Sequence, residues 1–421
     1  MVRLEMCFTI GQDLFADETT MMNVFRPLFP ALLLLLSAFG TPAGAADTIR
    51  IGVSCPMTGG SADMGISMRN GVRLAVEEIN TMAGGVAGRQ IELVERDDQG
   101  NPDLGKSVAE DLIAREKVVA TIGVCNTGVG LATIDAYQKA KVPLLVAVST
   151  GTPLTKKYAA EPEHYIFRVS PRDEVQAPFV VAEALKRGFR KIALFADTTG
   201  YGEAGKNDVE KALAAAGLTP VSVQRFAVGV KDLAAQVREA RAAGADAVIS
   251  YTVGPEAAVL AKAIEKEKWP VQIIGSWPLS WRNFIDAAGS AGEGALVAVS
   301  FIQQASFQRR NAFIAAYRQK YNTPVIPAPM AAAQGYDTML LLFYALHQAQ
   351  SVEPAKIRAA LEKLERPVAG VITTYDHPFS KTDHDALSGN MLVMGVVRKG
   401  QIDYAYKEDA QKSFVVQRKK P

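Results

Sequence analysis

Short apolar stretches of strand length alternate with amphipathic stretches of helix length from residue 48 onward, and this alternation restricts the fold more than any other feature. "TIRIGVSC" and "VVATIGV" have the pattern of buried strands, and "GISMRNGVRLAVEEINTM" has that of a helix with one apolar face. Strands that are separated by helices pair in parallel and need helices on both faces of their sheet. The sequence therefore predicts an α/β fold with mostly parallel sheets flanked by helices.

The alternation falls into two units of similar size. The first ends after "VPLLVAV"; the second starts at "YIFRVSPRDEVQA" and contains the apolar runs "KIALFAD", "SVQRFAV", "DAVISYT" and "VQIIGS". Three helical stretches follow, and "NMLVMGVVRKGQIDYAY" predicts a β-hairpin that turns at Lys399-Gly400. A chain of 421 residues can form two domains, each with its own core. We therefore expect two lobes.

Residues 1–46 are expected to lie outside the fold. Arg26 precedes the apolar run "FPALLLLLSAF", and "TPAGAA" follows it with small residues at alternate positions. The run is shorter than the ~20 residues that span a bilayer, so it predicts a secretory signal peptide, cleaved near Ala45 or Ala46, and a periplasmic protein. Acidic residues near the start are unusual before a signal peptide and favour a later translation start. The candidate starts are Met1, Met21 and Met22, with the latter two favoured.

Motifs of common enzymes are missing from the sequence. It has no G-x-G-x-x-G after the first strand, no Walker loop, no G-x-S-x-G and no H-E-x-x-H. "YDHPFSKTDHDA" gathers Asp and His residues, but Pro378, Ser380 and Lys381 favour a solvated turn there over a metal site or an exported enzyme. The net charge of +2 gives no basis for nucleic-acid binding. We expect a protein that is not an enzyme and that uses no cofactor.

Two polar turns follow neighbouring apolar strands. "CNTGVG" comes after "ATIGV", and "STGTPLT" comes after "LLVAV". Hydroxyl groups beside the free N–H groups of a helix start can bind a carboxylate. Capping of the following helices explains the same residues, so both interpretations stay open at this point. The candidate residues are Cys125, Asn126, Thr127, Val148, Ser149 and Thr150.

Cys55 and Cys125 both follow strand-like runs and could lie close together. An exported protein of this size does not need a disulfide, so a Cys55–Cys125 bridge stays open. "GSWPLS" raises a different question, because it places Trp277 at the carboxyl end of a strand, where α/β proteins bind their ligands.

These stretches resemble the periplasmic binding proteins of branched-chain amino acid ABC transporters, the leucine/isoleucine/valine-binding family. The likeness covers nearly all of residues 48–400 and includes "GRQIELVERDDQGNP", "TIGVCNTGV", "VPLLVAVSTGTPLT", "FRVSPRDEVQA", "DTTGYGEAG" and "AAAQGYDTMLLL". It implies a type I periplasmic-binding fold, in which two Rossmann-like lobes are joined by three crossovers, here near residues 168, 299 and 374. Lobe I would comprise residues 47–168 and 300–374, and lobe II residues 169–299 and 375–421.

The resemblance also implies a ligand site between the lobes. Family members that bind amino acids hold the carboxylate with small polar residues that match Asn126, Thr127, Ser149 and Thr150, and a tyrosine of lobe II matches Tyr201. Their acidic residue for the ammonium group falls at about Trp277, and their aromatic hydroxyl falls at Met64. Asp63, next to Met64, could compensate in part.

The departures favour a ligand without a positive charge. A buried ammonium without a carboxylate partner is costly, whereas Trp277 and Met64 offer apolar walls. We expect a monomeric periplasmic receptor that binds a small carboxylate by hinge closure and delivers it to the permease and ATPase subunits of an ABC importer. An aromatic or other apolar organic acid is the first choice and an amino acid the second. A ligand-sensing module of a signalling system is a further alternative.

Overall fold

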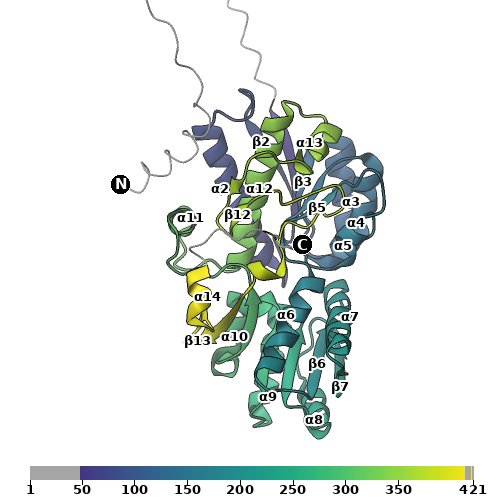
Figure 1. The fold of residues 1–421 in the computed structure, drawn as a ribbon, viewed down its shortest axis with the longest axis vertical. Coiled ribbons are helices and arrows are strands. Elements are labelled where there is room, and N and C mark those ends of the chain that lie inside the picture. Colours follow the sequence, from purple (N-terminus) through teal and green to yellow (C-terminus); the bar gives the residue numbers. More distant parts are fainter. Residues whose placement is uncertain (1–47, 413–418, 420–421) are drawn as a thin grey trace, which may run out of the picture.

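The computed structural model describes residues 48–412 and residue 419, which form two lobes (Figure 1). The upper lobe in the figure, lobe I, combines the purple and blue start of the chain with a green segment that comes much later. The lower lobe, lobe II, combines the teal middle of the chain with its yellow end. Each lobe is therefore built from segments that are far apart in the sequence.

Lobe I contains a five-stranded parallel sheet in the order β2-β1-β3-β4-β5. Helices α2 and α12 pack together on one face, and α3 and α4 pack together on the other. The strands are β1 (Ile49–Cys55), β2 (Ile91–Asp97), β3 (Ala120–Gly123), β4 (Leu144–Val146) and β5 (Ile166–Arg168). The helices are α2 (Ala62–Met82), α3 (Pro102–Glu110), α4 (Thr127–Ala140), α5 (Pro153–Lys156), α11 (Gln308–Lys320), α12 (Pro329–Ala349) and α13 (Pro354–Leu361). A π-helical turn, η1 (Asp111–Arg115), extends α3, and a two-stranded sheet joins β11 (Val368–Ala369) to β12 (Thr374–Tyr375).

Lobe II contains a seven-stranded sheet in the order β14-β13-β10-β9-β8-β6-β7. The five strands from β10 to β7 are parallel, and β13 and β14 add an antiparallel edge. The strands are β6 (Ile192–Asp197), β7 (Ser222–Phe226), β8 (Ala247–Tyr251), β9 (Gln272–Gly275), β10 (Leu296–Val299), β13 (Val393–Arg398) and β14 (Gln401–Tyr404). The helices are α6 (Asp173–Lys186), α7 (Gly200–Ala215), α8 (Ala234–Ala242), α9 (Gly254–Lys266), α10 (Arg282–Ala288) and α14 (Lys407–Lys412). Three 3-10 turns complete it: η2 (Trp277–Ser280), η3 (Gly289–Gly292) and η4 (Gly389–Met391).

The predicted α/β fold is confirmed, and so is the hairpin near the end of the chain. Arg398 pairs with Gln401, which leaves Lys399 and Gly400 as a two-residue turn. Both have a positive φ, 48° and 71°, as the turns that match the strand twist of a hairpin require.

The chain crosses between the lobes for the third time later than residue 374. Asp385 pairs with Arg168 at the edge of the lobe I sheet, through Arg168 N–His384 O (2.8 Å) and Ala386 N–Arg168 O (2.8 Å). The lobe II sheet resumes only at β13. Residues 375–387, predicted as part of lobe II, therefore accompany lobe I, and the crossing lies at about residues 388–392. The first two crossings follow β5 and β10, near the expected positions.

The turn predicted to be solvated, "YDHPFSKTDHDA", is only partly so. His377 is exposed, but His384 and Asp385 are both 3% exposed. Asp385 is buried because it pairs with Arg168 and Arg172, and His384 because its ring stacks on Phe167, with centroids 4.0 Å apart. Among the described residues, no group of three or more His, Cys, Asp and Glu side chains could hold a metal ion.

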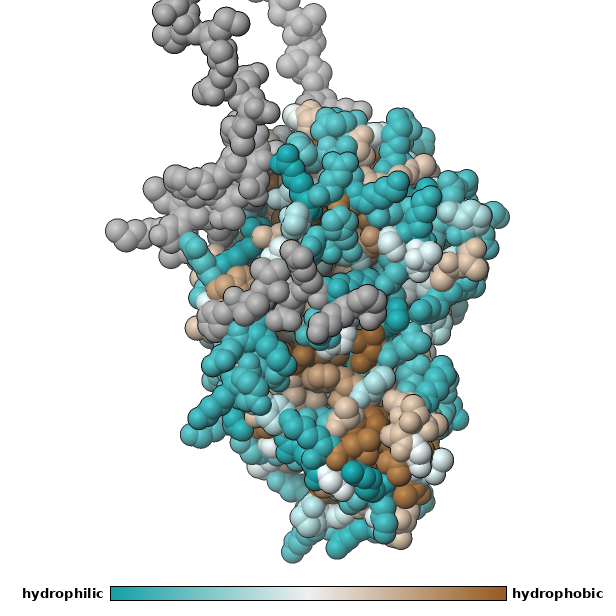
Figure 2. Space-filling view, in the orientation of Figure 1, coloured by the Kyte–Doolittle hydropathy of each residue, from teal (hydrophilic) through white to brown (hydrophobic). Residues whose placement is uncertain are grey.

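Most of the surface is hydrophilic, and apolar residues are visible where the lobes meet and on lobe II (Figure 2). In the part of the chain that the structure describes, no helix is long and apolar enough to span a membrane. The predicted signal peptide and its cleavage site lie outside the described residues.

Candidate functional site

Two polar turns lie side by side at the carboxyl edge of the lobe I sheet. The first, residues 125–127, leads from β3 into α4, and the second, residues 148–151, follows β4. Because β3 and β4 are neighbours, the hydroxyl groups of Thr127 and Ser149 meet at 2.9 Å, and both side chains are buried. α4 begins at Thr127, so the N–H groups of its first turn, which have no partner within the helix, point to the same place.

Capping does not account for the polar residues of these turns. Asn126 stands at the N-cap of α4, but its side chain makes no capping hydrogen bond and instead donates to Ser61 Oγ at 3.2 Å. Its Oδ1 is buried without a hydrogen-bond partner among the described residues, and Oγ1 of Thr150 is buried near the Asp173 carboxyl without a hydrogen bond of normal geometry there. Buried polar atoms are rarely left unpaired, so this pattern is typical of groups that bind something other than their own helix.

Tyr201 of lobe II lies at the start of α7, where the resemblance placed it. Its buried hydroxyl is hydrogen-bonded to Ser276 Oγ, which brings the start of α7 to the end of β9. Burial and the nearby Asp173 carboxyl raise the pKa of Tyr201 well above its ordinary value. The same two causes raise that of Tyr251, whose ring centroid lies 5.7 Å from that of Tyr201.

Asp173 is a candidate site residue that the sequence did not predict. It begins α6 directly after the first crossing, it is fully buried, and its N–H donates to Thr150 O at 2.8 Å. Burial raises the pKa of its carboxyl to about 7, although Thr150 and Arg168 lower it. Gln176 donates to Oδ1 at 3.3 Å, whereas Oδ2 accepts no hydrogen bond of normal geometry from the described residues, although the Thr150 hydroxyl lies close to the carboxyl. Asp173 therefore places a near-neutral carboxyl between the second polar turn and Tyr201.

Trp277 opens the 3-10 turn η2 directly after Ser276. Its ring is 3% exposed and packs edge-on against Trp281, with ring centroids 4.9 Å apart. Trp281 in turn lies against Gly254 at the start of α9. Nε1 of both indoles is buried with no acceptor in the described part of the chain. "GSWPLS" thus places an apolar ring and an available N–H donor directly after Ser276, the hydrogen-bond partner of Tyr201.

The residues predicted from the first turn of lobe I lie on α2. Met64 is buried, and Asp63 is partly exposed near Asp286 of lobe II. The pKa of Asp63 is raised, mainly by burial and to a smaller extent by the like charge of Asp286. No described contact joins Asp63 or Met64 to Trp277, so their place in one site stays a prediction.

Cys125 packs against the same helix, with its Sγ 4.0 Å from Met68 Sδ. Both Cys55 and Cys125 are buried free thiols. The two thiols interact with each other. The pKa of Cys125 is raised well above its ordinary value, mainly by burial and to a smaller extent by this contact with Cys55. The two thiols are not linked, so the disulfide that the sequence left open is not formed.

The two lobes touch at the edge of this site. A Cβ added at Gly200 of α7 would lie 3.0 Å from Cα and N of Gly128 in α4. Close by, the Thr152 hydroxyl donates to Asp208 Oδ2 at 2.6 Å. A separate cavity of about 700 Å³ lies on lobe I between α2, α11 and α12, away from the polar turns.

The site therefore combines hydroxyl and N–H donors from lobe I with aromatic rings from lobe II. Such a set can bind the oxygens of an anion at one end and an apolar body at the other. We found no nucleophile with an adjacent base among the residues of this site.

Comparisons with known proteins agree on one family. The family model described as periplasmic binding protein matches residues 48–401. The leucine-, isoleucine-, valine-, threonine- and alanine-binding protein of Pseudomonas aeruginosa is 28% identical over 344 residues, 79% of this chain and 87% of that protein.

Solved structures share the fold. A periplasmic binding protein type 1 from Bordetella pertussis superposes with a TM-score of 0.77 and 27% identity, over 85% of this chain and 99% of that one. A solute-binding protein of an ABC transporter from R. palustris, in complex with 4-hydroxybenzoate, gives a TM-score of 0.72 at 22% identity, over 85% and 95% of the two chains. The latter likeness concerns the fold alone.

Proposed function

The chain belongs to the periplasmic binding protein family, and we propose that its ligand is a small organic acid with an aromatic or other apolar body. Members of this family are solute-binding receptors rather than enzymes, and this chain is a solute-binding receptor of an ABC transporter. The proposal adds the class of ligand and assigns its binding to the two polar turns, Tyr201 and Trp277.

The observation that carries the proposal is the buried set of donors on the two polar turns. Thr127 and Ser149 are hydrogen-bonded to each other, and the Thr150 hydroxyl, which lies close to the Asp173 carboxyl, makes no hydrogen bond of normal geometry with the residues that the structure describes. A carboxylate can accept from the Thr150 hydroxyl, from whichever of Thr127 and Ser149 does not donate to the other, and from the first N–H groups of α4. The lobes would close over the ligand by bending at the three crossings, and no covalent step is involved.

Trp277 supports the choice of an apolar acid. It stands at about the position where the resemblance expects an acidic partner for an ammonium group, and its indole ring and free N–H suit an aromatic or oxygen-bearing ligand. The fold is compatible with such a ligand, since the R. palustris protein is in complex with 4-hydroxybenzoate.

Asp173 favours a second candidate, an α-amino acid. Its carboxyl lies beside Thr150, so a ligand with its carboxylate on the polar turns would bring its ammonium group toward Asp173. A bound ammonium would stabilise the charged form of Asp173 and offset its burial. The relative in P. aeruginosa is named for binding amino acids.

Pairs of ligands that differ only at the α-carbon separate the two candidates. We expect phenylpyruvate to bind at least ~100-fold more tightly than phenylalanine, and 4-methyl-2-oxopentanoate more tightly than leucine, because an unpaired buried charge costs several kcal/mol. Isothermal titration calorimetry on the mature protein measures both pairs. Replacing Trp277 by Glu should narrow or reverse the preference, since it returns an acidic side chain to this position.

Tight binding of leucine or phenylalanine with no binding of the oxo acids would contradict the organic-acid proposal and assign the site to amino acids. If none of these four ligands stabilises the protein in a thermal-shift assay, the site takes another class of solute. The role as importer receptor or as sensor is tested separately, by transport of the bound ligand in cells that lack the protein.

A further inference from the structure

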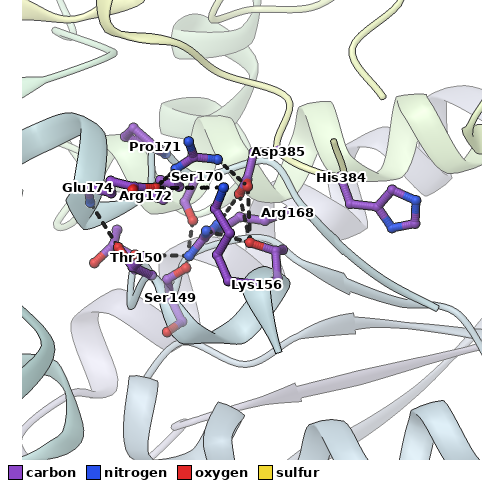
Figure 3. A network of polar contacts seen from close by, with 12 residues as sticks. Ser149, Thr150, Lys156, Arg168, Ser170, Pro171, Arg172, Glu174, His384 and Asp385 are labelled. Carbon is purple, nitrogen blue, oxygen red and sulfur yellow. Dashed lines mark hydrogen bonds and ion pairs between the residues drawn. The ribbon is translucent and has the colours of Figure 1, made fainter. Parts of the chain in front are cut away.

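A completely buried arginine holds the second polar turn from behind (Figure 3). Arg168 is the last residue of β5, and its Nη1 donates hydrogen bonds to the carbonyl oxygens of Thr150, at 2.9 Å, and Gly151, at 2.7 Å. These two carbonyls therefore point toward Arg168. The guanidinium therefore fixes the backbone to which the Ser149 and Thr150 hydroxyls are attached.

Asp385 balances the charge of Arg168 and fixes its orientation. Asp385 Oδ1 lies 2.6 Å from Arg168 Nε, although the two residues are 217 positions apart, and Oδ2 lies 2.8 Å from Arg172 Nη1. The Thr155 hydroxyl accepts from Arg168 Nη2 at 2.7 Å and donates to Asp385 at 3.0 Å. A planar guanidinium held on several sides in this way cannot rotate, so its donors keep their direction toward the turn.

The first crossing between the lobes contributes to the same arrangement. Ser170 Oγ donates to Ser149 O at 2.7 Å, and Asp173 N donates to Thr150 O at 2.8 Å. Residues 168–173 thus supply donors to three successive carbonyls of the second polar turn. Asp385, from the segment that leads into the third crossing, locks the start of this segment in place.

We propose that Arg168 and Asp385 are positioning residues for ligand binding: Asp385 orients Arg168, and Arg168 sets the second polar turn so that its hydroxyl groups face the anionic end of the ligand. The inference rests on the proposed function, because that function assigns the turn to the ligand. Neither residue contacts the ligand. Arg168 lies next to the first crossing and Asp385 lies on the segment that leads into the third, so both connect the crossings that bend during closure to the second polar turn.

Three variants separate positioning from simple stability. Arg168→Lys keeps the charge but cannot donate to both carbonyls and Asp385 at once. Asp385→Asn removes the orienting charge, and it risks loss of folding because it leaves the buried Arg168 with a neutral partner. The double variant Arg168→Met/Asp385→Leu replaces the ion pair by apolar side chains, an exchange that often preserves stability. Asp135→Asn, a surface carboxylate whose side chain is 62% exposed, is the matched control.

Hydrogen exchange of the ligand-free protein tests the inference without any assumption about the ligand. We expect residues 148–152 to exchange faster in the double variant and in Arg168→Lys, while the β6 and β8 amides keep their protection. Calorimetry with phenylpyruvate and with phenylalanine then tests the consequence. The probe that the wild type binds should bind at least about tenfold more weakly to the double variant and to Arg168→Lys, because a charged hydrogen bond is lost. Its affinity for Asp135→Asn should equal that for the wild type.

Unchanged exchange at residues 148–152 in a folded double variant would overturn the inference and leave Arg168 and Asp385 as residues of the core only. Wild-type affinity in that variant would overturn it as well. If neither probe binds the wild type while the turn does exchange faster, the ligand class is wrong and the positioning of the turn stands.

Discussion

The hydroxyl group of Thr150 offers a way to change ligand binding without changing the fold. Thr150 is 1% exposed, and its Oγ1 makes no hydrogen bond of normal geometry within the described residues, although it lies close enough to the Asp173 carboxyl to lower its pKa. Thr150→Val should therefore leave the melting temperature nearly unchanged but weaken the binding of an acid by about 1–3 kcal/mol, because a charged ligand group loses one buried donor.

Calorimetry and thermal unfolding of the same preparation check this prediction. Thr338→Val on α12, which also removes a buried hydroxyl, is the control and should cost stability rather than affinity, since Thr338 Oγ1 donates to Gln334 O at 2.6 Å. Equal affinities of wild type and Thr150→Val would place the anion of the ligand away from the second polar turn.

The protonation of Asp173 gives the two candidate ligands opposite pH profiles. Its pKa of about 7 lies above the ordinary value of 3.8, so the ligand-free protein carries Asp173 protonated below about pH 7 and ionised above it. Arg168 and Asp208 act on this carboxyl, and it lies near the hydroxyls of Tyr201 and Tyr251. An organic anion should bind more weakly as the pH rises through 7, whereas an α-amino acid should bind more strongly.

Asp173→Asn removes this titration and serves as the test. In the variant, binding of phenylpyruvate should become independent of pH between 6 and 8, and binding of phenylalanine should be lost. A wild-type affinity for either ligand that does not change over this range would mean that Asp173 is not next to the ligand. The raised pKa of Asp173 also affects stability. Between about pH 3.8 and pH 7 the unfolded chain has lost this proton and the folded protein still holds it, so the free energy of unfolding falls as the pH rises through this range.

Residue types and spacing suggested part of this candidate site, and the rest depended on contacts between distant segments. Asn126, Thr127, Ser149 and Thr150 could be proposed from the sequence because they follow apolar strands, a local signal. Asp173 could not, because an aspartate in the first turn of a helix is common for electrostatic reasons and only the tertiary fold buries it.

At the scale of elements, the alternation of apolar and amphipathic stretches predicted the strands and helices well because each signal is contained in a few residues. The third crossing was placed too early for the opposite reason. Residues 375–387 contain no long periodic stretch, and they follow lobe I because His384 O and Ala386 N pair with Arg168, far away in the sequence. The same contacts bury Asp385 and His384 in a segment whose Pro and Ser residues are typical of an exposed turn.

A stack of two histidines joins residues 375–387 to lobe I and predicts that the stability of the protein falls in acid. His164 and His384 stack with ring centroids 4.2 Å apart, and burial, followed by the neighbouring His384, lowers the pKa of His164 to about 3. The unfolded chain takes up this proton near pH 6.5, so stability is lost as the pH falls from about 6.5 toward 3.

Urea unfolding at pH 6.5 and pH 4.5 measures this loss. His164→Phe should reduce the drop in unfolding free energy between the two pH values by up to about 1.4 kcal/mol per pH unit, the limit for one proton. His347→Phe, at a partly exposed position of α12, is the control and should leave the drop as it is. A drop of equal size in wild type and His164→Phe would show that His164 is protonated in the folded protein.

At the scale of the molecule, the resemblance predicted two lobes and their three connections, but the sequence could not predict how the lobes meet. That depends on pairs such as Gly128 with Gly200 and Thr152 with Asp208, which no local pattern relates. Gly128 and Gly200 lie at the starts of α4 and α7, and Thr152, which directly precedes α5, follows the second polar turn. The fit of the lobes around a ligand is therefore set in part by two glycines.

Substitution of these two glycines tests whether this contact sets the closed form of the receptor. A Cβ at Gly200 would lie 3.0 Å from backbone atoms of Gly128, tighter than a side chain normally accepts, so Gly200→Ala should hold the lobes slightly apart. A Cβ at Gly128 meets nothing closer than Pro102 Cγ at 3.5 Å, which makes Gly128→Ala a matched control on the opposite side. We expect Gly200→Ala to weaken ligand binding by about tenfold and Gly128→Ala to have little effect, because closure that is less favourable lowers the apparent affinity by the same factor.

Small-angle scattering with saturating ligand should show a larger radius of gyration for Gly200→Ala only. If both variants bind and close like the wild type, the lobes do not meet at these helices in the ligand-bound receptor, and another pair of surfaces limits the closure.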